Sequence, residues 1–136
     1  MGDGWGECLT TGVMAIDEGN RELMLRVEQV IDACGEAGRP GAVVECMDTL
    51  SGFMIRHFSE EERLMKQRGY PGMKEHKMQH TAFLVELLGL MDTLDREGAS
   101  QSFVGAARAL LVDLLTDHVF MYDWDVGRYM RMDRAA

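Results

Sequence analysis

Apolar residues recur every three or four positions along most of this chain, and the strict alternation typical of a half-buried strand does not occur. Such spacing places the apolar residues on one face of a helix. Four stretches carry it: Leu23, Met24, Val27, Val30, Ile31 and Cys34; Val43, Met47, Leu50, Met54 and Phe58; Phe83, Leu84, Leu87, Leu88, Met91 and Leu94; Phe103, Ala107, Leu110, Leu111, Leu114 and Leu115. The pattern therefore predicts four amphipathic helices.

Short turn signals separate these stretches. Glycine and proline concentrate in residues 35–41 and 69–72, and residues 97–100 form a weaker break. We expect one domain over 1–136, with an N-terminal arm (1–16), helices over about 17–36, 41–67, 73–96 and 101–122, and a C-terminal segment (123–136). Asp17 is the expected N-cap of the first helix. Four similar helices joined by short turns predict an all-α fold, an antiparallel up-down four-helix bundle.

Composition and charge limit the partners and the cell compartment that we expect. The 136 residues carry a net charge of -9, which disfavours binding to nucleic acid or to an anionic membrane surface. No apolar run reaches the roughly 18 residues that a membrane span needs. Three cysteines without a CxxC pair argue against a disulfide framework, and the first twelve residues lack the features of a signal peptide. We expect a cytoplasmic protein, with a monomer as the default because the sequence does not set the oligomeric state.

Ligand-type residues interrupt three of the apolar faces. His57 continues the row of the second helix, and Glu61 follows four residues later. His76 and His80 stand four apart on the third helix, and His118 continues the face of the fourth. Residues four apart on a helix have Cβ atoms about 6 Å apart, so each pair can reach one metal or two neighbouring metals.

The joint placement of the histidines favours a metal site. A single histidine on a helix is more often a surface residue or a hydrogen-bonded core residue than a ligand. Here all four histidines of the chain fall at inward positions on three helices. Burying imidazole and carboxylate without partners is costly, and a shared metal ion removes that cost. Imidazole and carboxylate donors without thiolate suit iron or manganese, and also zinc.

Several motifs together resemble those of the hemerythrins, most closely the bacteriohemerythrins. The resemblance extends from Trp5 to about Tyr129. Its motifs are Trp5…Thr11-Gly12-Val13…Ile16-Asp17, His57-Phe58-Ser59-Glu60-Glu61-Glu62-Arg63-Leu64-Met65, Gly69-Tyr70-Pro71, His76-x3-His80 and His118-x4-Asp123.

The resemblance implies a hemerythrin-like bundle around a non-haem centre of two iron ions with an oxo or hydroxo bridge. One iron would take three histidines, and the other would take two, while two carboxylates bridge them. Molecular oxygen, or a similar small diatomic or peroxide ligand, would bind at the two-histidine iron. The positions that match the family's ligands are His76, His80 and His118 for the first iron, His57 for the second, and Glu61 and Asp123 for the bridges; Leu115 matches the residue that lines the oxygen pocket.

Regular helix geometry and the family pattern favour different aspartates as the ligand. Asp123 lies five residues after His118, about 140° around a regular helix. It can face the metals only if the helix loosens or ends there. Asp125, seven residues after His118, lies on the same face in a straight helix and remains the alternative.

Position 20 departs from the family pattern. The hemerythrins have a histidine after Ile-Asp-x-x, whereas this chain has Asn20 after Ile16-Asp17-Glu18-Gly19. An amide oxygen is a weaker ligand than imidazole and its side chain is shorter. Asn20 either ligates weakly, or holds a water at the open position, or leaves the second iron poorly bound.

Three functions remain open on these grounds. The first is an oxygen-binding protein for transport, storage or sensing, with an altered and more open second iron and no catalytic residue. The second is a di-iron oxidoreductase that reduces oxygen, peroxide or nitric oxide. The third is a degenerate or mononuclear metal-binding module. We favour oxygen binding over enzymatic turnover.

Overall fold

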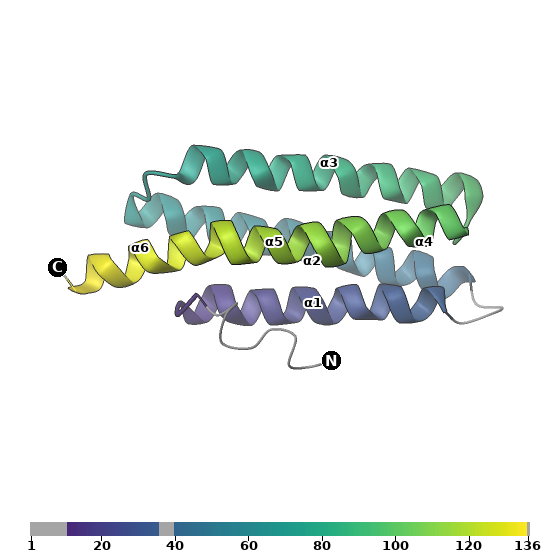
Figure 1. Cartoon of the computed structure of the whole chain (residues 1–136), viewed down its shortest axis with the longest axis horizontal. Coiled ribbons are helices and arrows are strands. Elements are labelled where there is room, and N and C mark those ends of the chain that lie inside the picture. Colours follow the sequence, from purple (N-terminus) through teal and green to yellow (C-terminus); the bar gives the residue numbers. More distant parts are fainter. Residues whose placement is uncertain (1–10, 36–39, 136) are drawn as a thin grey trace.

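The chain folds into four long helical rods that lie side by side and alternate in direction (Figure 1). The computed structural model describes residues 11–35 and 40–135. The first three rods are α1 (Met14–Cys34), α2 (Pro40–Arg68) and α3 (Met73–Glu97). The fourth is continuous but changes its helical pitch along the segments α4 (Gln101–Ala107), η3 (Arg108–Leu114), α5 (Leu115–His118), η4 (Val119–Asp123) and α6 (Trp124–Ala135). The described residues form no strand, and the predicted all-α, antiparallel four-helix bundle is confirmed.

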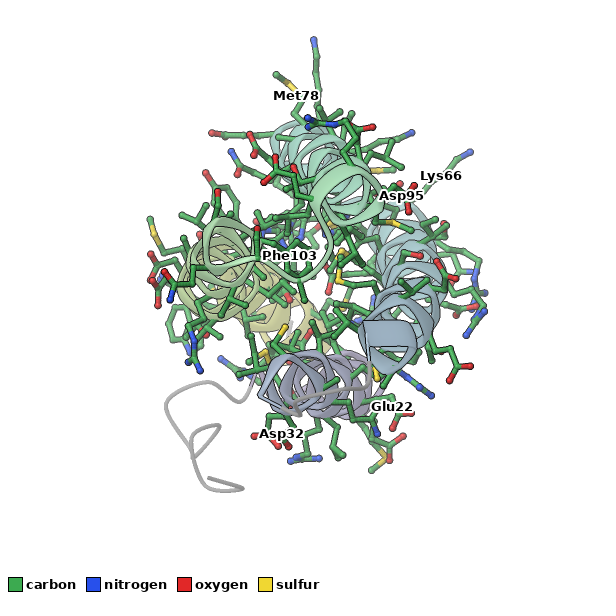
Figure 2. The ribbon with its side chains drawn as sticks, turned by 90° about the vertical axis from the view of Figure 1, so that its right-hand side faces the viewer. Glu22, Asp32, Lys66, Met78, Asp95 and Phe103 are labelled. Atoms are coloured by element: carbon green, nitrogen blue, oxygen red, sulfur yellow. The ribbon has the colours of Figure 1, made fainter. Side chains whose placement is uncertain are left out.

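The apolar faces meet along the axis of the bundle. Viewed from the end of the bundle, Phe103 points into the interior, whereas Glu22 and Lys66 project outward (Figure 2). The prediction that Leu88 and Leu114 belong to the buried faces is wrong, because Leu88 is 65% exposed and Leu114 is 52% exposed. Each follows or precedes a fully buried leucine in the sequence. For Leu88, a rotation of about 100° per residue carries the side chain beyond the narrow face that the bundle buries. Leu114 lies in the π-helical segment η3, whose wider turn changes the spacing of the buried face.

The first helix begins three residues before its expected start at residue 17. The expected role of Asp17 as N-cap is therefore wrong, since it lies inside the first turn. Its carboxylate instead accepts hydrogen bonds from the backbone N–H of Thr11 (2.8 Å), the Thr11 hydroxyl (2.7 Å) and the backbone N–H of Gly12 (3.1 Å). Asp17 thereby fixes the chain that leads into α1. Of the expected arm, residues 1–10 lie outside the described part.

The fourth rod continues well past residue 122, where the sequence analysis ended it. Residues 124–135 form α6 in place of the expected C-terminal segment. Val126 and Met130 are buried in a second apolar cluster with Ile16 and Met65. This burial at helical spacing explains why the helix continues. No helix in the described ranges is both long enough and apolar enough to cross a membrane.

Candidate metal centre

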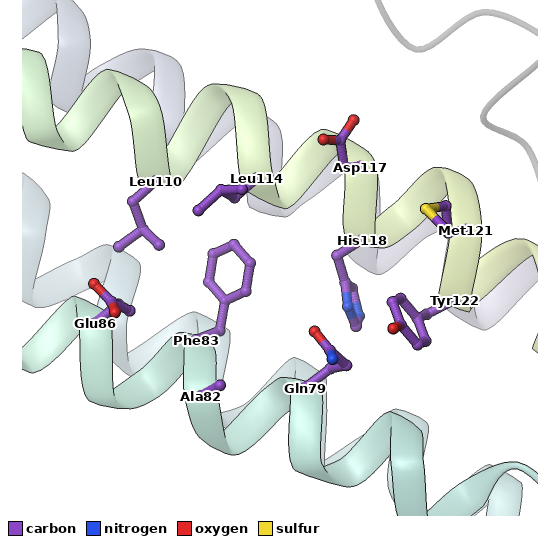
Figure 3. Close-up of a pocket in the computed structure, with 10 residues that line it drawn as sticks. All are labelled: Gln79, Ala82, Phe83, Glu86, Leu110, Leu114, Asp117, His118, Met121 and Tyr122. Carbon is purple, nitrogen blue, oxygen red and sulfur yellow. The ribbon is translucent and has the colours of Figure 1, made fainter.

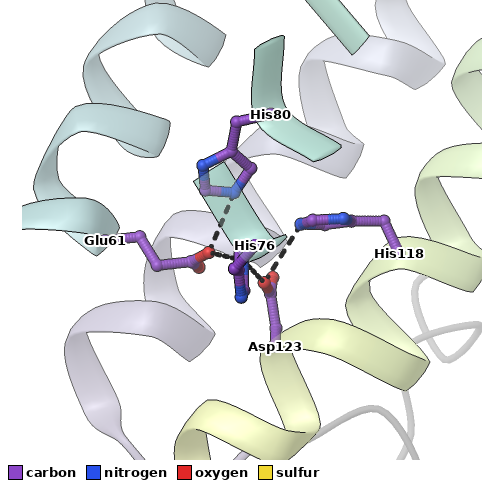
Figure 4. A group of neighbouring side chains, drawn as sticks. All are labelled: Glu61, His76, His80, His118 and Asp123. Atoms are coloured by element: carbon purple, nitrogen blue, oxygen red, sulfur yellow. Dashed lines mark ion pairs between the residues drawn. The ribbon is translucent and has the colours of Figure 1, made fainter. Parts of the chain in front are cut away.

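Five buried side chains from three of the four rods converge in the core (Figure 4). Each offers one ligand atom, and these atoms all lie within 4.8 Å of one another. Every one of the five residues is at most 4% exposed. We call this group the five-donor cluster; its members are Glu61 on α2, His76 and His80 on α3, His118 on α5 and Asp123 on η4.

The donor atoms of this cluster point at a shared centre. Glu61 Oε1 lies 2.6 Å from His76 Nε2 and 3.1 Å from His80 Nε2. Asp123 Oδ1 lies 3.0 Å from His76 Nε2 and 3.2 Å from His118 Nε2. Despite these short distances, none of the five atoms has a correctly oriented hydrogen-bond partner among the described residues. Polar atoms that lack a hydrogen bond at this depth are costly, and a cation bound by all five would remove the cost. The donor set therefore fits one metal ion.

Residues around the cluster orient its histidines. His80 Nδ1 lies 2.8 Å from Glu62 Oε2. Because a carboxylate only accepts, Nδ1–H donates and Nε2 keeps its lone pair for a metal. The ring of Phe58 stacks on that of His80 with centroids 3.9 Å apart, and Tyr122 stacks on His118 at 5.4 Å. Glu62 was not predicted from the sequence, because it stands in an acidic run and does not share the face of His57 and Glu61.

A wide helical turn brings Asp123 into the cluster. The segment η4 is π-helical, so its hydrogen bonds join residues five apart and not four. Asp123 therefore comes to lie one turn beyond His118 and on the same side of the rod. The alternative, Asp125, is exposed on α6 and lies outside the cluster.

Burial and close contact shift the pKa values of the cluster. Burial, followed by the charge of Asp123, raises the pKa of Glu61 to about 7. Burial opposes protonation of His76, but the carboxylates of Asp123 and Glu61 outweigh it and raise its pKa to about 9. Burial and the neighbouring His76 and His118 lower the pKa of His80 to about 4. His80 is therefore neutral, as a ligand must be, at any pH near neutrality.

Asn20 and His57 lie at the edge of the cluster. Asn20 is buried on α1, and its Nδ2 donates to Asp123 Oδ2 at 3.2 Å. Its Oδ1 lies 2.8 Å from His57 Nε2. The same nitrogen lies 4.0 Å from Glu61 Oε2. The structure thus brings His57 close to the expected ligands, but its nitrogen faces the amide of Asn20.

Two hollows reach these residues from the surface. One, of about 370 Å³, lies between α3 and the fourth rod; His118, Phe83 and Tyr122 form part of its wall (Figure 3). The other, of about 330 Å³, is lined by residues of α1 and α2 that include Gly19 and His57. Leu115, the expected oxygen-pocket residue, is fully buried in the main apolar cluster one turn before His118.

Comparison with known proteins identifies the family. The family model of the hemerythrin HHE cation binding domain matches residues 11–123. The chain belongs to the hemerythrin family. The resemblance drawn from its motifs is thereby confirmed, and the bundle is hemerythrin-like.

Individual hemerythrins resemble the chain at moderate identity. A bacteriohemerythrin of Pseudomonas aeruginosa is 29% identical over 80 residues, and one of Stenotrophomonas maltophilia is 31% identical over the same length. Each alignment covers 59% of this chain and 52% of the relative, so the match spans about half the length of these bacteriohemerythrins. The myohemerythrin of Sipunculus nudus is 27% identical over 94 residues, which is 69% of this chain and 72% of that protein.

Proposed function

We propose that this hemerythrin is a non-haem iron protein that binds molecular oxygen, or a similar small diatomic or peroxide ligand, in the core of the bundle. The observation that supports it most is the convergence of five buried donor atoms without hydrogen-bond partners in the described structure. Three imidazoles and two carboxylates suit iron, and iron supplies redox chemistry toward oxygen. The ligands we propose are the members of the five-donor cluster.

The chain's own residues would prepare the site in three ways. Glu62 holds His80 in the tautomer that presents Nε2 to the metal. Phe58 and Phe83 surround the histidines with apolar rings, which keeps bulk water from the donors. The hollow beside His118 gives a small uncharged ligand a mostly apolar route toward the core.

The sequence favours a two-iron centre with an oxo or hydroxo bridge and a more open second iron held by His57. The structure supports the first metal position more strongly than the second, because His57 is not a member of the five-donor cluster. The cytoplasmic location inferred from the cysteine pattern stays a prediction, and transport, storage and sensing remain compatible roles.

Turnover is the second candidate function. The hollow at Gly19 and His57 opens the edge of the cluster toward solvent. Solvent access to a ferrous centre favours irreversible oxidation over reversible binding. An oxidoreductase that reduces oxygen, peroxide or nitric oxide therefore stays the alternative.

Iron analysis combined with visible spectra of the reduced protein before and after oxygen tests this proposal. We expect bound iron and a new absorption band that disappears when oxygen is removed. Steady oxygen consumption without a reversible band would favour turnover. The variant His76→Ala should lose the iron, whereas Asp125→Ala, at an exposed position, should keep it. Native protein without bound metal would refute the proposal.

A further inference from the structure

We propose that this chain holds a single metal ion, in the five-donor cluster, and that a hydrogen-bonded pair of Asn20 and His57 takes the place of the second metal. This single-ion proposal rests on the proposed function, because both require that the five-donor cluster binds a metal. It departs from the two-iron centre that the family resemblance implies.

Two of the three protein atoms left at the edge of the cluster for a second ion are already hydrogen-bonded. Beyond the atoms that converge on the first position, His57 Nε2, Asp123 Oδ2 and Glu61 Oε2 remain. The amide of Asn20 bonds two of them, with 2.8 Å to His57 Nε2 and 3.2 Å to Asp123 Oδ2. Of these three atoms, only Glu61 Oε2 lacks a partner among the described residues. A second ion would have to break both bonds of the amide.

The carboxylate of Asp123 fixes the orientation of this amide. Asn20 Nδ2 lies 3.2 Å from Asp123 Oδ2, and a carboxylate oxygen accepts the hydrogen bond that an amide NH₂ group donates. Asn20 must therefore point its NH₂ group at Asp123 and its oxygen at His57. An amide oxygen also only accepts, so His57 Nε2 must carry the proton. That nitrogen then has no lone pair to offer to a metal.

Gly19 places the His57 ring where this pairing is made. A Cβ atom at position 19 would lie 2.2 Å from both His57 Nδ1 and His57 Cε1. The ring thus occupies space that any other residue at this position would fill. It lies against α1, beside Asn20, because position 19 is a glycine.

Replacing the pair by a second metal would bring poor ligands. The ion would have one imidazole, an amide oxygen and shares of two carboxylates that already serve the first ion. An amide oxygen is a weaker ligand than imidazole for divalent iron. The amide, in contrast, satisfies two buried polar groups without adding a charge. The residues present therefore fit one metal and do not fit two.

Anaerobic titration of this chain with ferrous iron, with the number of bound metal ions per chain as the readout, tests the proposal. We expect saturation at one ion per chain in the native protein. The variant His57→Ala should also saturate at one ion, whereas His76→Ala should lose the site. Saturation of native protein at two ions, or loss of the single ion in His57→Ala, would overturn the inference.

Variants at position 20 test the role of the amide. Asn20→His supplies a second imidazole, and we expect it to raise the saturation value above one ion per chain. Asn20→Ala removes the amide without adding a ligand and should stay at one. Each variant is first checked for a native-like unfolding transition. If both then bind one ion per chain, Asn20 is not the reason for the missing second metal.

The tautomer of His57 gives a readout that needs no variant. In protein loaded with zinc, which is diamagnetic, nitrogen-15 NMR distinguishes a protonated ring nitrogen from one that binds metal. We expect His57 Nε2 to carry a proton, and a metal-bound Nε2 would overturn the inference. Failure of the native chain to bind any metal would refute the proposed function itself. Two bound metals would refute only the single-ion proposal.

Discussion

At the scale of single residues, the side chains that contact the five-donor cluster decide how its histidines are oriented. The ring of Phe58 stacks on the ring of His80, and the carboxylate of Glu62 accepts a hydrogen bond from His80 Nδ1. Glu60 and Glu62 look equivalent in the sequence, two residues apart in an acidic run. In the structure Glu60 is exposed and pairs with Arg63, whereas Glu62 reaches a buried histidine.

This difference predicts unequal effects of matching substitutions. Glu62→Ala removes the acceptor that fixes the His80 tautomer, and we expect metal affinity to fall about 10-fold or more. Glu60→Ala should leave affinity within about twofold, because exposed ion pairs contribute little. Competition with a chromophoric chelator measures both. Equal affinities of the two variants would show that Glu62 does not support the site.

Glycine substitutions test the packing of His57 against α1. Gly19→Ala places a methyl group 2.2 Å from the His57 ring, so the ring must shift. We expect the free energy of unfolding to fall by about 1–3 kcal/mol, the usual cost of overpacking. Gly89→Ala on α3 is the control, since its Cβ would meet no atom within 4 Å.

At position 89, the better helix propensity of alanine should stabilise the protein by up to about 1 kcal/mol. Urea unfolding of the metal-free proteins compares the two. If Gly19→Ala unfolded with the same free energy as the native protein, the His57 ring would have to adopt another position without cost.

At the scale of elements, the change of pitch in the fourth rod aligns its two members of the five-donor cluster. A π-helical turn contains one residue more than an α-helical turn. In η4 this extra residue lets His118 and Asp123 share one side of the rod although they are five residues apart. The segment before and the segment after continue as ordinary α-helix.

Single-residue deletions distinguish the wide turn from a regular helix. Deleting Met121, which is 59% exposed in η4, leaves His118 and Asp123 four residues apart, the spacing that shares a face in an α-helix. We expect this variant to keep its metal. Deleting Met78, which is 63% exposed on α3, rotates everything after it by about 100° and should abolish metal binding. Metal per chain and helical circular dichroism report the outcome, and loss of metal in both variants would contradict this account of η4.

At the scale of the whole molecule, the centre links three rods directly and the fourth only through an amide. The five-donor cluster draws on α2, α3 and the last rod, whereas α1 contributes Asn20 by hydrogen bonds. A ligand that binds only the folded state stabilises it according to its concentration, by about 2.7 kcal/mol at 100 times its Kd.

Metal should therefore raise the thermal unfolding midpoint of the entire bundle. We expect the same upward shift in native protein and in His57→Ala, because His57 is not a ligand of the single ion. His76→Ala should show no shift. Calorimetry with and without metal measures this. A shift that disappears in His57→Ala would place that residue among the ligands.

The sequence by itself determined the four helical rods and the donor types of the candidate metal centre. Helical spacing of apolar residues is a local property, so it predicted the four rods without knowledge of their contacts. It failed at their ends, at Asp17 and beyond residue 122, where burial against distant residues extends the helices. Polar side chains on apolar faces pointed to Glu61, His76, His80 and His118, because such side chains need a shared partner. Asp123 came only from the resemblance to the hemerythrins.

Only the tertiary structure decided which of these side chains meet and which atoms remain free. The wide turn placed Asp123 in the core and left Asp125 outside, although regular helix geometry favours the reverse. The packing of His57 against Gly19 brought its nitrogen to the amide of Asn20. Such pairings join residues on different rods, and the orientation of each rod is set by packing along its whole length. No local pattern in the sequence contains that information.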